Sequence, residues 1–376
     1  MEQSKVKNND ASYSMKIFFT VTTDLTYDQR MIRISTSLAN AGYKVVLVGC
    51  KRKSSLPLIA QPFQQKRLRC FFEKGKLFYA EYNTRLFFFL LLKKMDVICA
   101  IDLDTILPCY FISVIKRIRR VYDAHELFCE MKEIVTRRSI YNLWKKIERY
   151  TVPKFQLGYT VNQPIAEEFK KMYGVQYWVI RNISVLRPIE YLVKTEKFIL
   201  YQGAVNEGRS FETIIPAMKT VNCKLIICGD GNFMPQARKL VRENNVEDRV
   251  VFKGKITPME LRQITLQSYI GLTLFENTGL SNYYSLANRF FDYLHAGIPQ
   301  LCVDYPVYHE INAQLPVAVL VKDISSKNLS EQMNNLLHNK VLYDELSNNC
   351  KQARQKYNWQ EEEKVLISFY EQLNRS

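Results

Sequence analysis

The chain has 376 residues, of which 47% are hydrophobic and 24% are charged. These are globular proportions, and the length exceeds what one core ordinarily organises, so we expect two domains. A membrane-spanning protein is not expected: the apolar run 86–92 stops at Lys93 and Lys94, far short of the roughly 20 residues of a spanning helix. The polar residues 1–14 also do not resemble a signal peptide.

Nine cysteines, an odd number, lie mostly in apolar runs and form no Cys-x-x-Cys pair. This pattern predicts buried reduced thiols in a cytoplasmic protein, not disulfides or a zinc site.

The net charge of +16 is unevenly distributed. Residues 1–190 hold 32 basic and 17 acidic residues, whereas residues 191–376 hold 21 and 20. The first half therefore carries the positive field, which favours contact with a polyanion, either nucleic acid or an anionic membrane.

In chain order, a disordered segment 1–14 precedes a first domain, 15–190. Short apolar strands are predicted at 16–22, 43–49, 95–102, 119–125 and 157–162, with a helix at 27–42 and further helical stretches between the later strands. Strands that alternate with helices indicate a parallel sheet wrapped by helices.

The pattern restarts after a linker at 185–198, and the second domain is expected to cover 191–355. Its strands are predicted at 198–204, 223–231, 249–255, 270–275 and 299–304. A last helix, within 356–376, is expected to return to the first domain. The predicted fold is α/β, with two doubly wound Rossmann-like domains facing across a cleft.

The stretch NRFFDYLHAGIP, 288–299, predicts a short helix that begins near Ser285 to Asn288 and ends before Gly297 and Pro299. Helical spacing places Phe290, Phe291 and Leu294 on a buried side, and Arg289, Asp292 and His295 on an adjacent stripe. Such a helix start attracts anions, although a capped surface helix with an ion pair remains an alternative.

Five successive stretches carry a resemblance: YQGAVNEGR, IICGDGN, VVFKGKI, IGLTLFEN and SLANRFFDYLHAGIP. First-half stretches agree with it: DQRMIR, AIDLDTILP, YDAHELF, YTVNQPIAEEFKKMYG and VIRN. Together they resemble nucleotide-sugar glycosyltransferases of the GT-B fold, and more closely the retaining glycosyltransferase family 4. The resemblance covers roughly residues 15–370.

The resemblance implies a donor site in the second domain. Asp292 matches the acidic residue that binds ribose hydroxyls, and a carboxylate suits a vicinal diol because it accepts two hydrogen bonds. Arg209 stands where a lysine contacts the diphosphate, and Arg289 is the second candidate cation. The other implied donor-binding residues are Gly203, Lys253, Gly254, Ser285 and Asn288.

Five positions depart from the family pattern. Tyr284 replaces the first carboxylate of a Glu-x7-Glu pair, and Ala204 replaces an arginine of the diphosphate site. Ala287, Arg289 and Asp292 replace a proline, a lysine and a glutamate; the last two preserve charge but alter reach, which bears on the donor that the site accepts.

In the first half, His125 and Glu126 follow a strand end and are the predicted catalytic residues, since the family places a histidine near the sugar. Asp24 and Arg30 are predicted on the acceptor side, where Arg30 either approaches a phosphate or pairs with Asp28. No metal or cofactor is expected: Asp102 and Asp104 have the spacing of a manganese site, but the stretch from Asp102 to Thr105 is interpreted as the cap of a helix from Leu107.

Residues 137–155 interleave basic and apolar side chains. At helical spacing Ile140, Leu143, Trp144 and Ile147 form an apolar stripe, and Lys145 and Lys146 lie among the flanking cations. The pattern fits an interfacial membrane helix and equally an amphipathic core helix with a solvated basic face.

The predicted function is transfer of a sugar from a nucleotide-sugar to a glycan or lipid-linked acceptor, by an enzyme on the cytoplasmic face of an anionic membrane. The alternatives are a nucleotide-sugar epimerase and a non-catalytic nucleotide-sugar or polyanion-binding module. Nucleic acid is not an expected partner, because no RNA- or DNA-binding motif is found.

Overall fold

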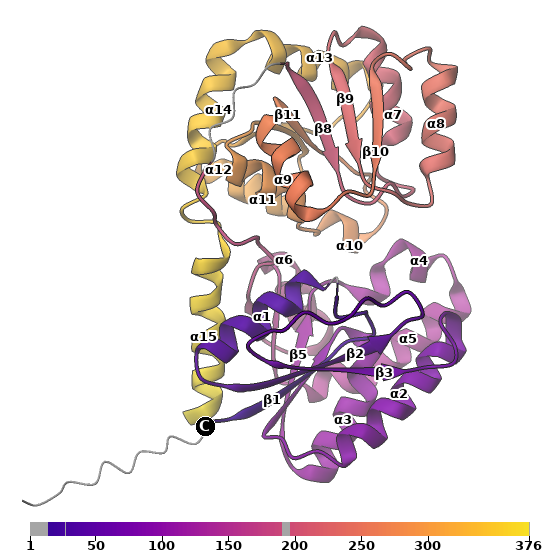
Figure 1. Cartoon of the computed structure of the whole chain (residues 1–376), viewed down its shortest axis with the longest axis vertical. Helices are drawn as coiled ribbons and strands as arrows, with labels where there is room; N and C mark the ends of the chain where they lie inside the picture. Colours follow the sequence, from indigo (N-terminus) through magenta and orange to yellow (C-terminus); the bar gives the residue numbers. More distant parts are fainter. Residues whose placement is uncertain (1–13, 27, 190–195, 376) are drawn as a thin grey trace, which may run out of the picture. The chain divides into compact units, whose positions relative to one another are not determined.

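The computed structural model describes residues 14–26, 28–189 and 196–375. The expected disordered segment at 1–14 lies outside this range except for its last residue, as does part of the expected linker. Two compact units are present (Figure 1). The first is formed by the chain up to Ala124, by Lys146–Gly158 and by the chain from Leu366; the second consists of His125–Lys145 and Tyr159–Val365.

The first sheet has seven strands in the order β3-β2-β1-β4-β5-β6-β7. Its strands are β1 Lys16–Thr20, β2 Lys44–Lys51, β3 Gln64–Arg69, β4 Val97–Ile101, β5 Arg119–Ala124, β6 Leu157–Thr160 and β7 Trp178–Val179. The helices between them are α1 Gln29–Asn40, α2 Gly75–Leu91, α3 Ile106–Lys116, α4 Lys132–Val135, α5 Arg138–Thr151 and α6 Gln163–Tyr173.

The second sheet has six strands in the order β10-β9-β8-β11-β12-β13. Its strands are β8 Phe198–Gln202, β9 Lys224–Cys228, β10 Val250–Gly254, β11 Ile270–Thr273, β12 Gln300–Val303 and β13 Ala318–Val321. Its helices are α7 Phe211–Ala217, α8 Met234–Glu243, α9 Pro258–Gln267, α10 Leu280–Tyr283, α11 Asn288–Ala296, α12 Pro306–Gln314, α13 Ser326–His338 and α14 Lys340–Ala353, followed by α15 Trp359–Arg375.

Strand β8 shows why these sequences form covered parallel sheets. All five of its residues are buried, and alternate side chains point to opposite faces. Ile199 and Tyr201 enter the larger core cluster, which includes residues of α7, α8 and α13. Phe198 and Leu200 enter a second cluster with Tyr293 of α11. A strand covered on both faces needs a continuous apolar run rather than alternation.

The prediction of two parallel-sheet Rossmann-like domains is confirmed: every strand pair whose register is described is parallel. Three strands were not predicted from the sequence: β3, β7 and β13. β3 has the sequence QQKRLR and pairs only with β2, so an edge strand with exposed charges carries little hydrophobic signal.

The face of α5 differs from the predicted one. Leu143, expected in the apolar stripe, is 52% exposed, whereas Lys145, expected among the solvated cations, is 8% exposed and lies 3.4 Å from Glu130 Oε1. The Trp144 ring packs edge-on against Phe128, with 5.1 Å between ring centroids. The inward face is therefore rotated relative to the predicted stripe, and Lys145 is not a surface cation.

Among the helices in the described ranges, none has the length and hydropathy needed to cross a bilayer. None of the nine cysteines, all of which lie in the described ranges, forms a disulfide, as predicted, and seven of them are buried.

Candidate functional site

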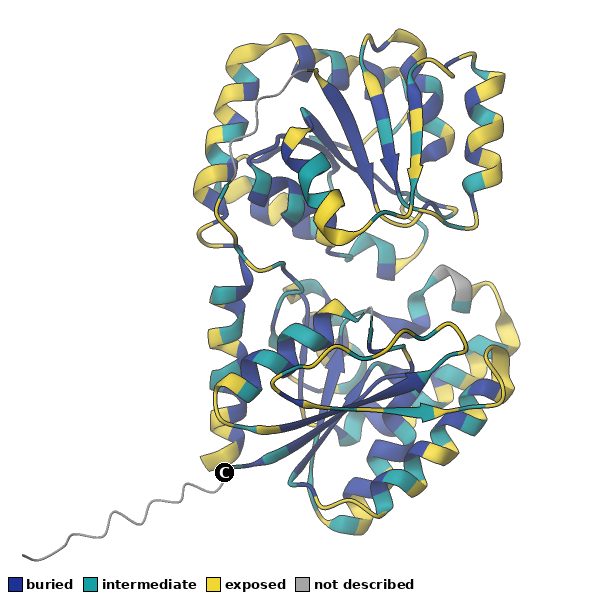
Figure 2. Ribbon diagram, viewed as in Figure 1, coloured by how far each residue is buried: buried dark blue, intermediate teal, exposed yellow. Residues whose placement is uncertain are grey.

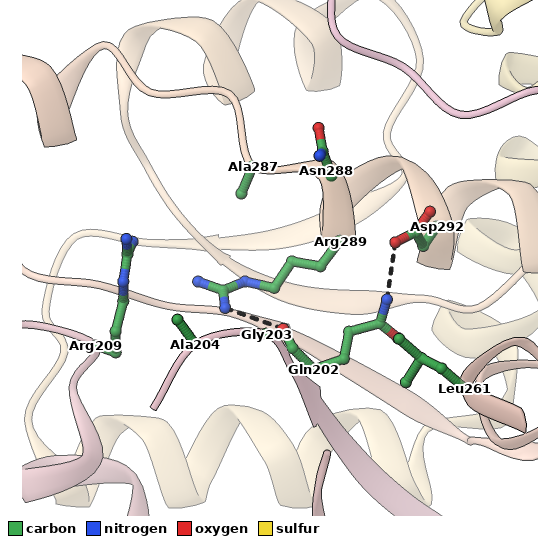
Figure 3. Close-up of a pocket in the computed structure, with 9 residues that line it drawn as sticks. All are labelled: Gln202, Gly203, Ala204, Arg209, Leu261, Ala287, Asn288, Arg289 and Asp292. Atoms are coloured by element: carbon green, nitrogen blue, oxygen red, sulfur yellow. Dashed lines mark hydrogen bonds between the residues drawn. The ribbon is translucent and has the colours of Figure 1, made fainter. Parts of the chain in front are cut away.

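A pocket of about 260 Å³ lies at the carboxyl end of β8 in the second unit. Its lining comes from β8 and the following loop, from Leu261 of α9, and from the start of α11 (Figure 3). Open parallel sheets bind ligands at this edge because the loops there carry the free ends of helices. Its lining residues are Gln202, Gly203, Ala204, Arg209, Leu261, Ala287, Asn288, Arg289 and Asp292.

Two close-packed glycines shape the floor of this pocket. Gly203 has φ +125°, and a Cβ atom there would lie 3.2 Å from Nη1 of Arg289. A Cβ atom at Gly229 would lie 1.8 Å from the Gly203 carbonyl oxygen. Gly203 requires glycine because of its positive φ, and Gly229 requires it because the loop after β9 touches the Gly203 backbone.

Arg289 is the buried cation of the site. It is 8% exposed and donates from Nη1 to the Gln202 carbonyl oxygen over 3.1 Å. Its guanidinium carbon lies 4.6 Å from the centroid of the Tyr201 ring. The Nε atom is buried and makes no hydrogen bond to the described residues. A buried N–H donor without an acceptor costs free energy. The Nε atom therefore marks a position where an acceptor atom of a ligand can bind.

Arg209 supplies a second cation beside the first. Figure 3 shows the Arg289 side chain extending toward Arg209. The guanidinium carbons of Arg209 and Arg289 lie 5.6 and 5.9 Å from the Phe275 ring centroid. Two guanidinium groups gathered on one ring create a concentrated positive field that suits an anion such as a diphosphate.

Asp292 lies about one turn along α11 from Arg289 and is held in place by two hydrogen bonds. Its Oδ1 accepts a hydrogen bond from Ser184 Oγ and its Oδ2 accepts one from Gln202 Nε2, each over 2.8 Å. Each carboxylate oxygen has a second lone pair, so the group can still accept from a ligand. The two bonds fix the direction in which Asp292 faces the pocket.

Sequence reasoning missed two residues that line this pocket, the apolar Leu261 and the polar Gln202. Gln202 is 4% exposed, donates to Asp292, and accepts a 2.8 Å hydrogen bond from Thr265 Oγ1 on its Oε1 atom. Its carbonyl oxygen also holds Arg289. The available signal was a polar side chain at the end of an otherwise apolar buried strand.

Helix α11 occupies the predicted place and ends as predicted. Its C-cap, Gly297, has φ +70° and its N–H bonds to the carbonyl oxygens of Leu294 and Tyr293. Phe290, Phe291 and Leu294 are buried as expected. The N-cap is Ala287, which offers no side-chain cap. The Phe290 amide donates to the Ala287 carbonyl oxygen over 3.0 Å, so the amides of Asn288 and Arg289 are the ones available to an anion.

The other predicted donor residues are dispersed. Lys253 and Gly254 end β10 and line neither this pocket nor the second one. Gly254 instead accepts a hydrogen bond from Gly229 N over 2.8 Å. Asn288 lines this pocket, whereas Ser285 lines only the second.

That second pocket, of about 270 Å³, is lined by residues of the second unit alone. It brings His125 and Glu126, which directly follow β5, together with Arg209, Ser285 and Asn288. The predicted catalytic pair thus shares a pocket with three of the predicted donor residues.

On the predicted acceptor side, Arg30 is 6% exposed and makes a two-pronged ion pair with Asp123, at 2.7 and 3.3 Å. It does not pair with Asp28, which instead caps α1 by accepting from Met31 N. The short side chain of Asp28 bonds its own helix start, which leaves the buried Asp123 as the partner that neutralises Arg30.

Asp24 lies in the loop after β1. Burial raises the pKa of Asp24, but hydrogen bonds from Ser55, Thr26 and Arg67 outweigh it and hold the pKa below its ordinary value. The ionised carboxylate therefore organises this loop.

Comparison with known proteins gives a family for the second half. Residues 183–357 match the model of the glycosyl transferases group 1 family. No curated protein sequence matches the chain.

Among solved structures, sucrose-phosphate synthase from Thermosynechococcus elongatus is similar, with TM-score 0.78 and 16% identity over 96% of this chain and 99% of that one. HepE of Anabaena, solved in complex with UDP-glucose, has TM-score 0.71 and 12% identity over 96% of this chain and all of that one. WaaG, a glycosyltransferase involved in lipopolysaccharide biosynthesis, has TM-score 0.69 and 14% identity over 94% and 99% of the two chains.

The family match and the shared two-sheet architecture agree with the resemblance found in the sequence. Residues 183–357 form a glycosyl transferases group 1 domain, and the chain as a whole has the GT-B fold of the solved structures; together these findings support a glycosyltransferase.

Proposed function

We propose that the protein transfers a glycosyl unit, with retention of configuration, from a nucleotide-sugar to a glycan or lipid-linked acceptor at an anionic membrane surface. The observation that carries the donor part is the pocket after β8. There Arg209 and Arg289 gather on the Phe275 ring beside an uncapped helix start, and Asp292 faces the same space.

In this proposal the diphosphate lies against the two guanidinium groups and the first amides of α11. Cleavage of the sugar–phosphate bond leaves negative charge on the departing diphosphate, and fixed cations lower the energy of that transition state. Arg289 takes the role of the arginine that Ala204 replaces. No divalent metal is required, because two arginines supply the neutralising charge.

Asp292 binds the ribose hydroxyls, and the hydrogen bonds from Ser184 and Gln202 keep its carboxylate oriented for that contact. His125 lies at the sugar end, where an imidazole can hydrogen-bond a hydroxyl group of the transferred unit or of the acceptor. The shared second pocket, which joins His125 to Arg209 and Asn288, supports this placement.

The membrane part is supported by the charge distribution. Of the net surplus of 16 basic residues, 15 lie in residues 1–190, and a lipid-linked acceptor would be presented at an anionic surface. The same donor site could also serve a glycan acceptor in solution. Donor binding and membrane binding are therefore tested by separate experiments.

The donor part is tested by calorimetric titration with UDP, GDP and ADP, followed by the 2′,3′-dideoxy form of the nucleotide that binds best. We expect Asp292→Ala to weaken binding of the normal nucleotide at least about tenfold, since a charge-assisted hydrogen bond contributes about 1.5–3 kcal/mol. The variant should also lose the preference for ribose over dideoxyribose.

The matched control is Glu345→Ala, which removes an exposed carboxylate on α14 in the same unit and should change neither quantity. An unchanged ribose preference in Asp292→Ala would remove Asp292 from the ribose site. Transfer or hydrolysis of the corresponding nucleotide-sugar then separates an enzyme from a binding module, and recovery of an epimerised donor would favour the epimerase.

A further inference from the structure

We propose that the outer sides of α2 and α3 form the surface by which this protein docks on an anionic lipid bilayer. The proposal rests on the proposed function for its membrane partner, but its observations come from a different part of the chain. We call this surface the α2–α3 face. Its apolar residues are Leu77, Phe88, Leu92, Phe111, Val114 and Ile115, and its cations are Lys76, Arg85, Lys93, Lys94, Lys116 and Arg117.

Helix α2 is apolar on both of its sides. Phe78, Tyr82, Leu86 and Leu90 are buried in the first unit. On its outer side Leu77, Phe88 and the following Leu92 are 59%, 59% and 82% exposed. A surface helix ordinarily shows a polar outer side, and one that is apolar all round is ordinarily covered. The outer side of α2 therefore has the composition of a contact surface.

Helix α3 continues this surface. It packs alongside α2, as Figure 1 shows, and it places Phe111, Val114 and Ile115 outward, each at least 44% exposed. Exposed residues mark the outer sides of both helices in Figure 2. Single exposed apolar residues are ordinary, but six on two adjacent helices mark an interaction site.

The charge of the α2–α3 face selects the partner. Its six basic side chains are accompanied on these helices by one acidic residue, Glu81. That carboxylate already accepts from Phe71 N, Phe72 N and Arg85 Nε, at 2.8 to 3.0 Å. Apolar side chains ringed by lysine and arginine fit the boundary between acyl chains and anionic headgroups.

A second copy of the chain fits less well. A two-fold symmetric contact would place the same cations of both copies against one another, and like charges brought together in an interface oppose association. Helix α5, which the sequence pattern at 137–155 suggests as an interfacial membrane helix, is a weaker candidate for the docking surface. Its Lys145 is buried beside Glu130 and is not exposed to lipid headgroups.

The test measures partition of the full chain onto vesicles of phosphatidylcholine, with and without about 30% phosphatidylglycerol. We expect binding to the anionic vesicles. Phe88→Ser with Leu92→Ser should lower partition at least about tenfold at low and high salt, because the apolar contact is not screened. Lys93→Glu with Lys94→Glu should lower it at least about tenfold at low salt only, since each cation contributes about fivefold.

Matched controls come from the second unit. Met259→Ser with Val341→Ser removes two apolar side chains that are 77% and 80% exposed, and Lys327→Glu with Lys351→Glu reverses two exposed lysines. Both controls should partition as the unchanged protein does. Circular dichroism melting confirms that each variant is folded.

The proposal is overturned if the unchanged protein stays off anionic vesicles, or if α2–α3 variants partition as their controls do. It is also overturned if light scattering shows a dimer that Phe88→Ser with Leu92→Ser converts to monomer while vesicle partition stays the same. Nucleotide binding in solution should be equal in all these proteins. If the unchanged protein does not bind nucleotide, that result counts against the donor site and leaves the docking result standing.

Discussion

At the residue scale, a few residues of the donor pocket each make several of the contacts that hold it together. Gln202 orients Asp292 through its amide and holds Arg289 through its carbonyl oxygen. Arg289 in turn lies over Gly203, where any Cβ atom would crowd it. The two proposed donor contacts, to ribose and to diphosphate, are thus coupled through a single strand-end residue, and substitutions at these positions should not be additive.

Arg289→Gln tests the diphosphate contact. Removing a buried cation should weaken UDP or GDP at least about tenfold, because charge-assisted hydrogen bonds are lost, while affinity for the corresponding nucleoside stays nearly unchanged. Isothermal titration with diphosphate and nucleoside measures both.

The control for this prediction is Arg249→Gln. Arg249 donates to the carbonyl oxygens of Met218, Lys219 and Val221, away from the pocket, so its loss should affect stability rather than nucleotide affinity. Equal weakening of diphosphate and nucleoside in Arg289→Gln would show that the arginine only supports the fold.

At the element scale, α11 is anchored at its far end by His295. The side chain is 8% exposed and its Nε2 lies 2.7 Å from the Tyr357 carbonyl oxygen. Burial lowers the pKa of His295 to about 4; the hydrogen bond to Tyr357 opposes this shift, and the charges of Arg354 and Arg262 add to it. The ring is therefore neutral in the folded protein at neutral pH.

This anchor predicts a pH dependence of stability. The pKa of the unfolded histidine is 6.5, so the unfolded chain binds the proton more readily. The stabilisation is fully present above pH 6.5 and is lost as the pH falls toward about 4, a loss of about 3 kcal/mol. Denaturant unfolding at several pH values measures it.

His295→Gln should make the free energy of unfolding less dependent on pH between pH 6.5 and about 4, because the glutamine amide does not titrate. Its N–H can still donate to the Tyr357 carbonyl oxygen. Identical slopes in the two proteins would assign the acid sensitivity to other groups.

At the scale of the whole molecule, nucleotide binding should couple to stability of the second unit. A ligand at a hundred times its Kd adds about 2.7 kcal/mol to the folded state, which raises Tm by roughly 5–10 °C for a unit of about 200 residues. If calorimetry resolves two transitions, we expect the nucleotide to move only one. A shift of both transitions by equal amounts would contradict a donor site confined to the group 1 domain.

Much of this architecture follows from the sequence. Short apolar strands alternating with helices specify parallel sheets, because a strand covered on both faces needs a continuous apolar run, as in β4 and in the first four residues of β8. The stop at Gly297 and the buried side of α11 follow from local chemistry, since only glycine adopts the left-handed cap without strain. The ordered motifs likewise indicate the GT-B fold and the group 1 domain at 183–357.

Tertiary structure decided what local pattern leaves open. Arg30 pairs with Asp123 and not with its near neighbour Asp28, because the β5 carboxylate is buried and needs a counter-charge. Lys145 is drawn inward by Glu130, and Gln202 gains its role only when Ser184, Thr265 and α11 meet beside it. Periodicity reports which residues can be buried, whereas the partner of a polar group depends on which strands and helices are brought together by the fold.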